Sequence, residues 1–236
     1  MPTTADIVKE IKQSFRQMMD GSVAQSMRDK GLNYHLNWGA TLPRLKEKAE
    51  ELKAMLNEQR TEVNGQPSSN SSQPSAESQL SLNSSQYELA LSLWKENVRE
   101  CKILATMLMP PDEILPEVID IWMEQTHTQE IAEQAAMNLY RFLPYAPEKA
   151  YQWIASDREL YQLCGFHVLS RLFMNGQEPN ERGINEFVDQ ALAAILGPSM
   201  MVRKAAFNAL QRFAELGLVY ERIAQSAIKR ANLDFL

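Results

Sequence analysis

The chain has 236 residues, of which 44% are hydrophobic and 23% are charged, proportions typical of a globular protein with a buried core. This length fits one domain or one extended array of repeats. The formal net charge of −6 argues against non-specific nucleic-acid binding by the surface as a whole, because phosphate contacts require clustered Lys and Arg.

The first 60 residues predict three short helices. Thr3 or Thr4 can cap the first, and Gly21 can end it. A shorter helix over about 22–30 follows, and Pro43 lies in the first turn of a helix that starts near Thr41. Apolar residues recur at helical spacing in the first and third helices, at Ile7, Ile11, Phe15, Met18, Leu45, Ala49, Leu52 and Leu56.

Residues 65–86 differ from the rest in composition, with nine Ser among 22 residues and a single charge. Such a segment cannot offset its ordering entropy by burial, so we expect a flexible insert. We interpret it as a loop within one array, since three short helices make a thin core for a separate domain. The prediction is therefore a single repeat domain over 1–236.

The remainder predicts helices with short breaks at Pro and Gly, and no alternating strand pattern is seen. The approximate spans are 87–108, 112–126, 129–143, 147–155, 158–174, 181–196, 199–215 and 217–232.

A short pattern recurs in three of these helices: AAMNLYR at 135, CGFHVLSR at 164 and AAFNALQR at 205. Small residues at a fixed place allow close helix approach, which favours stacked helical pairs of the HEAT or armadillo type. The polar positions Asn138, His167 and Asn208 would then line one edge of the stack. An irregular helical bundle with chance similarity is the alternative.

Charge is distributed unevenly along the chain. Residues 87–198 hold eight basic and seventeen acidic side chains, whereas residues 199–236 hold six basic and three acidic ones. Arg203, Lys204 and Arg212 lie on one side of a late helix, where they form either a solvated face or an anion-binding one. Glu133, one turn after Gln129, is either a solvated helix acid or a carboxylate that stabilises a developing cation.

Other chemistry finds little support in the sequence. The three histidines lack the spacing of a helical zinc pair, so we expect no metal and no cofactor. The two cysteines, Cys101 and Cys164, lie in apolar helical patterns and are predicted to be buried reduced thiols. The first residues lack a secretory signal and no stretch approaches the roughly 20 apolar residues of a membrane span, which predicts a cytoplasmic protein without membrane contact.

Two segments carry a family resemblance. GATLPRL at 39–45 is similar to the Gly-Val-x-x-Pro-x-Leu-Arg-like helix start of the AlkD-like DNA alkylation repair family. LALSLW at 89–94, with Arg99 and Glu100, is similar to the family's Leu-Ala-x-x-Leu-Trp-x-x-x-x-Arg-Glu segment. In this interpretation Trp94, with the apolar residues around it, is scaffold, and Arg99-Glu100 is a structural polar pair.

The resemblance implies an all-α fold, a superhelical solenoid of HEAT-like repeats with a concave groove for double-stranded DNA. It also implies a glycosylase that excises N3- and N7-alkylated purines without base flipping, unlike most enzymes that act on bases. In the family an Asp supports the oxocarbenium-like sugar, two Trp flank it, and an Arg holds the DNA backbone.

Carried over by motif, the family's Asp falls on Glu133, which keeps the carboxylate. The first Trp falls on Gln129 and the second on Asn208, with Phe207 beside it as a substitute ring. The backbone-binding Arg falls on Leu163. Lys204 keeps a family Lys, and Arg203 and Arg212 are added as candidate DNA contacts.

Two functions from different classes remain open on the sequence. The first is a monomeric DNA alkylation repair-like protein that binds duplex DNA in a concave groove, with weak alkylpurine glycosylase activity centred on Glu133. The alternative is a catalytically inactive HEAT-repeat module that binds a protein partner.

Overall fold

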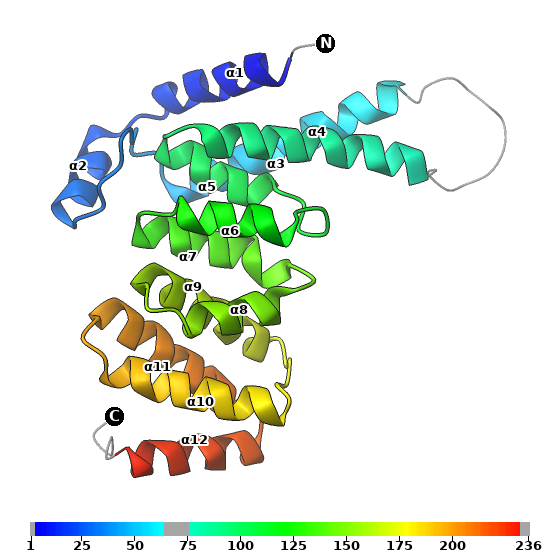
Figure 1. Ribbon diagram of the computed structural model, residues 1–236. Helices are drawn as coiled ribbons and strands as arrows, with labels where there is room; N and C mark the ends of the chain where they lie inside the picture. The colour runs from blue at the N-terminus through cyan, green and yellow to red at the C-terminus, as the bar shows by residue number, and fades with distance from the viewer. Residues whose placement is uncertain (1–2, 64–75, 232–236) are drawn as a thin grey trace. The chain divides into compact units, whose positions relative to one another are not determined.

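The computed structural model describes the backbone of residues 3–63 and 76–231, and side chains over 3–57 and 85–231. Within those ranges the fold is entirely helical apart from one isolated bridge between Leu36 and Val98. The chain divides into two compact units, Met1–Trp122 and Met123–Leu236, each shown with its helices in chain order in Figure 1.

The first unit begins with a capped helix: Thr3, one of the two predicted caps, forms a reciprocal capping box with Asp6. Gly21 begins the second helix instead of ending the first, because Asp20 accepts hydrogen bonds from the backbone N–H groups of Ser22 and Val23 and so caps the second helix. The helices of this unit are α1 (Thr4–Gln17), α2 (Gly21–Asp29), α3 (Leu42–Val63), α4 (Ala76–Lys95) and α5 (Arg99–Leu108), and α6 (Pro116–Glu124) crosses the boundary.

Helix α5 is the centre of the first unit, packed against both α3 and α4, and eight of its ten residues are buried. Trp94 at the end of α4 is buried and stacks on Trp122, with ring centroids 4.1 Å apart and planes 3° apart. These contacts confirm the interpretation of Trp94 as scaffold.

The predicted helix over 87–108 is wrong in one respect: it is two helices, α4 and α5, separated at Val98. Val98 is extended (φ −128°, ψ 129°) and bridges to Leu36, and the backbone N–H of Arg99 donates to the carbonyl of Leu36 at 3.0 Å. Pairing with a distant segment thus overrides local helix propensity, which is worth only fractions of a kcal/mol per residue.

The Ser-rich insert expected over 65–86 lies partly outside the described residues, which resume at 76. From Ala76 onward the chain is helical, as the first half of α4. Ser disfavours helix only weakly, so a helix anchored by its packed C-terminal half extends backward through such residues. The flexible insert stays a prediction for the remaining residues.

The second unit is built around α9, which packs against α7, α8 and α11. Gly165 makes the α8–α9 contact close, since an added Cβ there would lie 2.8 Å from both the carbonyl oxygen of Ala150 and Cγ2 of Ile154. The elements are α7 (Gln129–Asn138), a 3-10 helix η1 (Tyr140–Phe142), α8 (Ala146–Ile154), α9 (Glu159–Met174), α10 (Glu181–Leu196), α11 (Met200–Ala214) and α12 (Leu218–Arg230).

Both predicted free thiols are confirmed as buried, and burial raises the pKa of Cys101 to about 12. The Cys164 thiol donates to the carbonyl of Ala132 at 3.7 Å, and burial also raises its pKa. Neither thiol is therefore a nucleophile at neutral pH.

Candidate functional site

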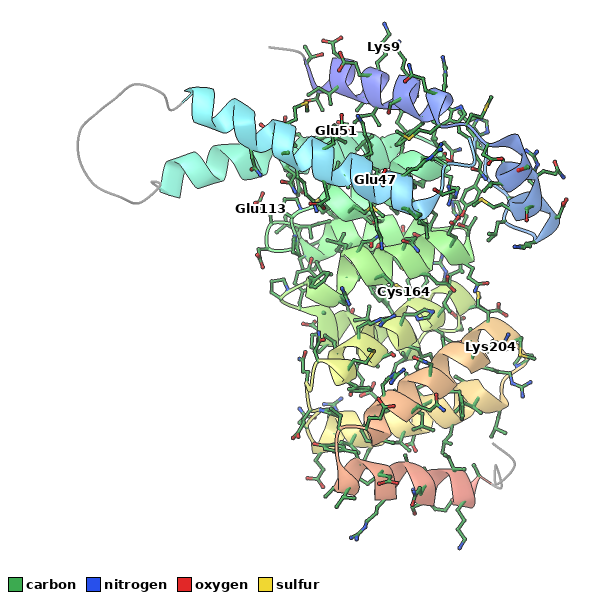
Figure 2. All side chains as sticks on the ribbon, turned by 180° about the vertical axis from the view of Figure 1, so that it is seen from behind. Lys9, Glu47, Glu51, Glu113, Cys164 and Lys204 are labelled. Atoms are coloured by element: carbon green, nitrogen blue, oxygen red, sulfur yellow. The ribbon has the colours of Figure 1, made fainter. Side chains whose placement is uncertain are left out.

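The predicted site residues lie on three adjacent helices of the second unit, α7, α9 and α11. Between α7 and α9, Glu133 contacts His167 and, one turn later in both helices, Met137 contacts Arg171. Between α9 and α11, Ser170 contacts Asn208. Helices α7 and α9 therefore run parallel, and α11 contacts α9 on its other flank; we call the side of these helices that carries Glu133, His167, Arg171 and Asn208 the inner face. Figure 2 shows Lys204 on α11 and Cys164 on the neighbouring α9.

Glu133 is the carboxylate of this face, with 35% of its side chain exposed. The amide Nε2 of Gln129, one turn earlier, donates to Glu133 Oε1 at 2.7 Å. His167 Nε2 lies 3.9 Å from the same oxygen. Gln129 thus positions the carboxylate, a task that differs from the ring contact made by the family's Trp and from the substrate contact predicted for Gln129.

His167 is the residue of α9 that faces Glu133. Burial lowers its pKa and outweighs the opposing effect of Glu133, while Arg171 adds to the lowering. The imidazole is therefore neutral at pH 7, and Glu133 has no full cationic partner there.

Arg171 and Arg141 form the most unusual electrostatic feature of the inner face. Arg171 donates from Nε to Met137 Sδ at 3.0 Å and from NH1 to Met174 Sδ at 3.4 Å, and thioether sulfur is only a weak acceptor. Arg141, on η1, stacks over the ring of Phe142 at 4.3 Å, and its buried Nε has no partner among the described residues. Burial and the charge of Arg171 both lower the pKa of Arg141.

Two guanidinium groups thus lie close enough to repel each other. In the described part of the chain neither arginine forms an ion pair. The nearby carboxylate of Glu133 contacts Gln129 and His167, and that of Glu215 pairs with Arg212. Arginines in such a position are typical of sites that bind carboxylate or phosphate.

Helix α11 adds further positive charge. Arg203 and Lys204 are exposed and, within the described residues, unpaired. Lys204 lies one turn before Asn208, on the same side of the helix. Arg212 differs, because it is held by Glu215 through bonds of 2.9 and 2.7 Å. Of the three basic residues predicted here, two are available to a ligand and one is neutralised.

Asn208 is exposed, but its amide oxygen accepts a hydrogen bond from the buried hydroxyl of Ser170 at 2.8 Å. This bond ties α11 to α9 and leaves the amide nitrogen for a ligand. Phe207, the suggested substitute ring, is half-buried beside it.

The structure also places the remaining positions of the sequence alignment. Leu163, on which the backbone-binding Arg was placed, is only 1% exposed and belongs to the core. Asn138 and His167 are half-buried and Asn208 is exposed, so all three polar positions lie outside the core; Asn138 donates to Gln134 and His167 faces Glu133.

Sequence reasoning named Arg99, Arg141 and Arg171 as cations whose convergence with Arg203, Lys204 and Arg212 would favour DNA binding, but it placed none of the first three among the candidate site residues. Arg141 is carried by η1, a single 3-10 turn that lies inside the longer helix predicted over 129–143. The signal available was the Arg that ends each copy of the repeat pattern. Arg99, considered beside them, is 1% exposed in the first unit and takes no part in this surface.

No helix in the described ranges is long and apolar enough to cross a membrane. Nor do the described side chains bring together three or more His, Cys, Asp or Glu residues that could hold a metal.

A search of curated protein sequences gives no match to this chain. Among solved structures, the chain is similar to a protein from a new family related to the HEAT-like repeat DNA glycosylases, with affinity for branched DNA structures. The TM-score is 0.68 at 16% sequence identity, over 94% of this chain and 80% of the other. The predicted fold class, an all-α solenoid of HEAT-like repeats, is thereby confirmed. Residues 45–215 match the model of the DNA alkylation repair enzyme family, and the chain belongs to that family.

Proposed function

We propose that this protein binds DNA through the inner face of its second unit, with Arg141, Arg171, Arg203 and Lys204 as contacts to backbone phosphates. The observation that carries the proposal is that Arg141 and Arg171 form no ion pair among the described residues, that the buried Nε of Arg141 has no partner there, and that Arg171 bonds only to weakly accepting sulfur atoms; a bound phosphate would supply the missing acceptors. Arg203 and Lys204 extend the positive charge onto α11.

The DNA form that we propose is the duplex, because phosphate contacts spread over η1, α9 and α11 suit a continuous backbone. The related protein of similar fold has affinity for branched DNA, which makes a junction the natural comparison substrate. Binding at one face is compatible with the acidic balance of the chain, since local charge rather than net charge sets the potential near a surface.

We further propose that Glu133 supports slow excision of N3- or N7-alkylated purines. The half-exposed carboxylate, positioned by Gln129, can stabilise the positive charge that develops on the sugar as the base leaves. Neither Gln129 nor Asn208 supplies an aromatic ring, and a cation–π contact in a desolvated site contributes about 2 kcal/mol. The rate should therefore be low.

DNA binding is tested by fluorescence anisotropy with a duplex and a four-way junction of equal strand length, over a range of salt concentrations. Replacing one phosphate-binding cation should weaken binding and reduce the slope of log K against log salt by about 1. We expect this for Arg171→Ala and Lys204→Ala. Arg182→Ala, an exposed arginine on α10, is the matched control and should leave the slope unchanged.

Excision is tested by release of N7-methylguanine and N3-methyladenine from methylated duplex DNA. The wild type should release base slowly, and Glu133→Gln should abolish release while retaining DNA affinity. Glu221→Gln, an acid of α12, is the control. DNA binding without release from the wild type would remove the excision proposal alone. If DNA does not bind, the alternative gains: an inactive HEAT-repeat module for a protein partner. Cytoplasmic location and a monomeric state stay predictions.

A further inference from the structure

The second unit also has a cavity of about 580 Å³, whose lining includes none of the site residues described above. It lies between α8, the C-terminal half of α9 and the start of α10. Its volume is within the range of roughly 300–1,000 Å³ typical of ligand pockets. The lining comes from three helices and the 175–180 connection, so the cavity is a product of the fold.

The floor of the cavity is apolar and rigid. Leu169, Leu172 and Phe173 of α9 form it, and all three are buried. Tyr151 of α8 closes one side and donates from its hydroxyl to the carbonyl of Gly183 at 3.0 Å. A Cβ at Gly183 would lie 2.9 Å from that hydroxyl, so glycine is what lets α8 and α10 be joined here.

The rim of the cavity is acidic. Glu148, Glu178 and Glu186 line it, against one basic residue, Arg182. Burial, with the charge of Glu186, raises the pKa of Tyr151 to about 12, which keeps its hydroxyl a neutral donor. Arg182 forms no ion pair among the described residues, so the three carboxylates are not neutralised by it.

The cavity and the inner face occupy opposite sides of α9. Successive residues of a helix are separated by about 100°, which places His167 and Arg171 roughly half a turn from Leu169, Leu172 and Phe173. A ligand in the cavity would therefore meet different side chains from DNA on the inner face.

We propose that this cavity is a docking site for a protein partner, which inserts a segment with an arginine beside an apolar residue. The apolar side chain and the aliphatic stem of the arginine would pack on Leu172 and Phe173, with the guanidinium among the rim carboxylates. A nucleic acid is a poor occupant, because its phosphates would meet three carboxylates. The proposal does not depend on the DNA-binding proposal.

The test uses the full chain without DNA and a blocked tetrapeptide, Leu-Arg-Leu-Arg, measured by calorimetry. The matched peptide has Gln in place of Arg, and spermidine serves as a cation without apolar side chains. We expect the Arg peptide to bind, and Glu148→Lys and Glu186→Lys to weaken binding about tenfold each. Glu148 is exposed, so its replacement leaves folding intact. Asp189→Lys, on α10 outside the cavity lining, should have no effect.

Four results would overturn the proposal: no binding of the Arg peptide, equal binding of the Gln peptide, an equal loss in Asp189→Lys, or equal affinity for spermidine. The last would show a site for a free polyamine. DNA affinity measured on the same variants should not change, which keeps this test separate from that of the DNA-binding face.

Discussion

The two units use arginine in opposite ways. In the first unit, Arg99 is buried beside Glu100, donating from NH1 to Glu100 Oε1 at 3.2 Å and to the carbonyl of Ala40 at 2.8 Å. In the second unit, Arg141 and Arg171 are half-buried and form no ion pair among the described residues, and the charge of Arg171 lowers the pKa of Arg141. The residue type is the same, but its partners decide whether the arginine stabilises the fold or remains free to bind a ligand.

The buried pair organises a segment far away in sequence. Glu100 accepts hydrogen bonds from the backbone N–H groups of Trp38 and Ala40, at 3.3 and 3.2 Å. Together with Arg99, it fixes the chain just before α3 to the start of α5. All of these residues are buried, so their polar groups depend on one another for hydrogen-bond partners.

The largest expected effect comes from breaking that pair. Arg99→Leu leaves Glu100 buried without its cation and should lower the free energy of unfolding by about 3–5 kcal/mol. Urea denaturation followed by circular dichroism measures it. A loss below about 1 kcal/mol would mean that the backbone N–H groups suffice, and the contrast between the units would weaken.

A smaller loss is expected from the interior of the second unit. Gly165→Ala places a methyl group 2.8 Å from the Ala150 carbonyl oxygen and Cγ2 of Ile154, and such overpacking costs about 1–3 kcal/mol. Gly21→Ala meets nothing within 4 Å and is the matched control. If the two variants unfold alike in urea, α8 and α9 have room to separate, and only the first unit has a tightly specified interior.

The surface arginines should behave differently from Arg99. Arg171→Gln removes a repulsion and only weak bonds to sulfur, so it should change the free energy of unfolding by no more than about 0.5 kcal/mol, the usual size for a substitution outside the core. The same variant should lose DNA affinity. Its thermal unfolding midpoint, measured beside that of Arg99→Leu, gives the contrast directly. A destabilisation as large as that of Arg99→Leu would make Arg171 a scaffold residue.

The smallest effect concerns pH. His167 has a pKa below its ordinary value in the folded state, so the unfolded chain binds the proton more readily. Its contribution to stability is therefore complete above the unfolded pKa of about 6.5 and declines as pH falls from there toward the folded value. Urea midpoints at several pH values should show this decline, and His167→Gln should remove it. An unchanged profile in the variant would assign the decline to other groups.

The helices of this protein were largely predictable from sequence, since apolar periodicity, caps such as Thr3 and breakers such as Gly31 act locally. The features that escaped prediction depend on particular contacts rather than on periodicity. Val98 is extended because Leu36 pairs with it, and Gly21 begins a helix instead of ending one because Asp20 caps the helix that follows. A motif gives the order of residues along a helix, but packing decides which of them face a ligand.

The position of α9 has a thermodynamic consequence. Its two sides belong to the two proposed ligands, so it is the structural element through which either could influence the other. Any factor by which a bound peptide changes DNA affinity must equal the factor by which DNA changes peptide affinity. A factor of one would mean that the two sites bind independently, and any other value would mean that α9 couples them.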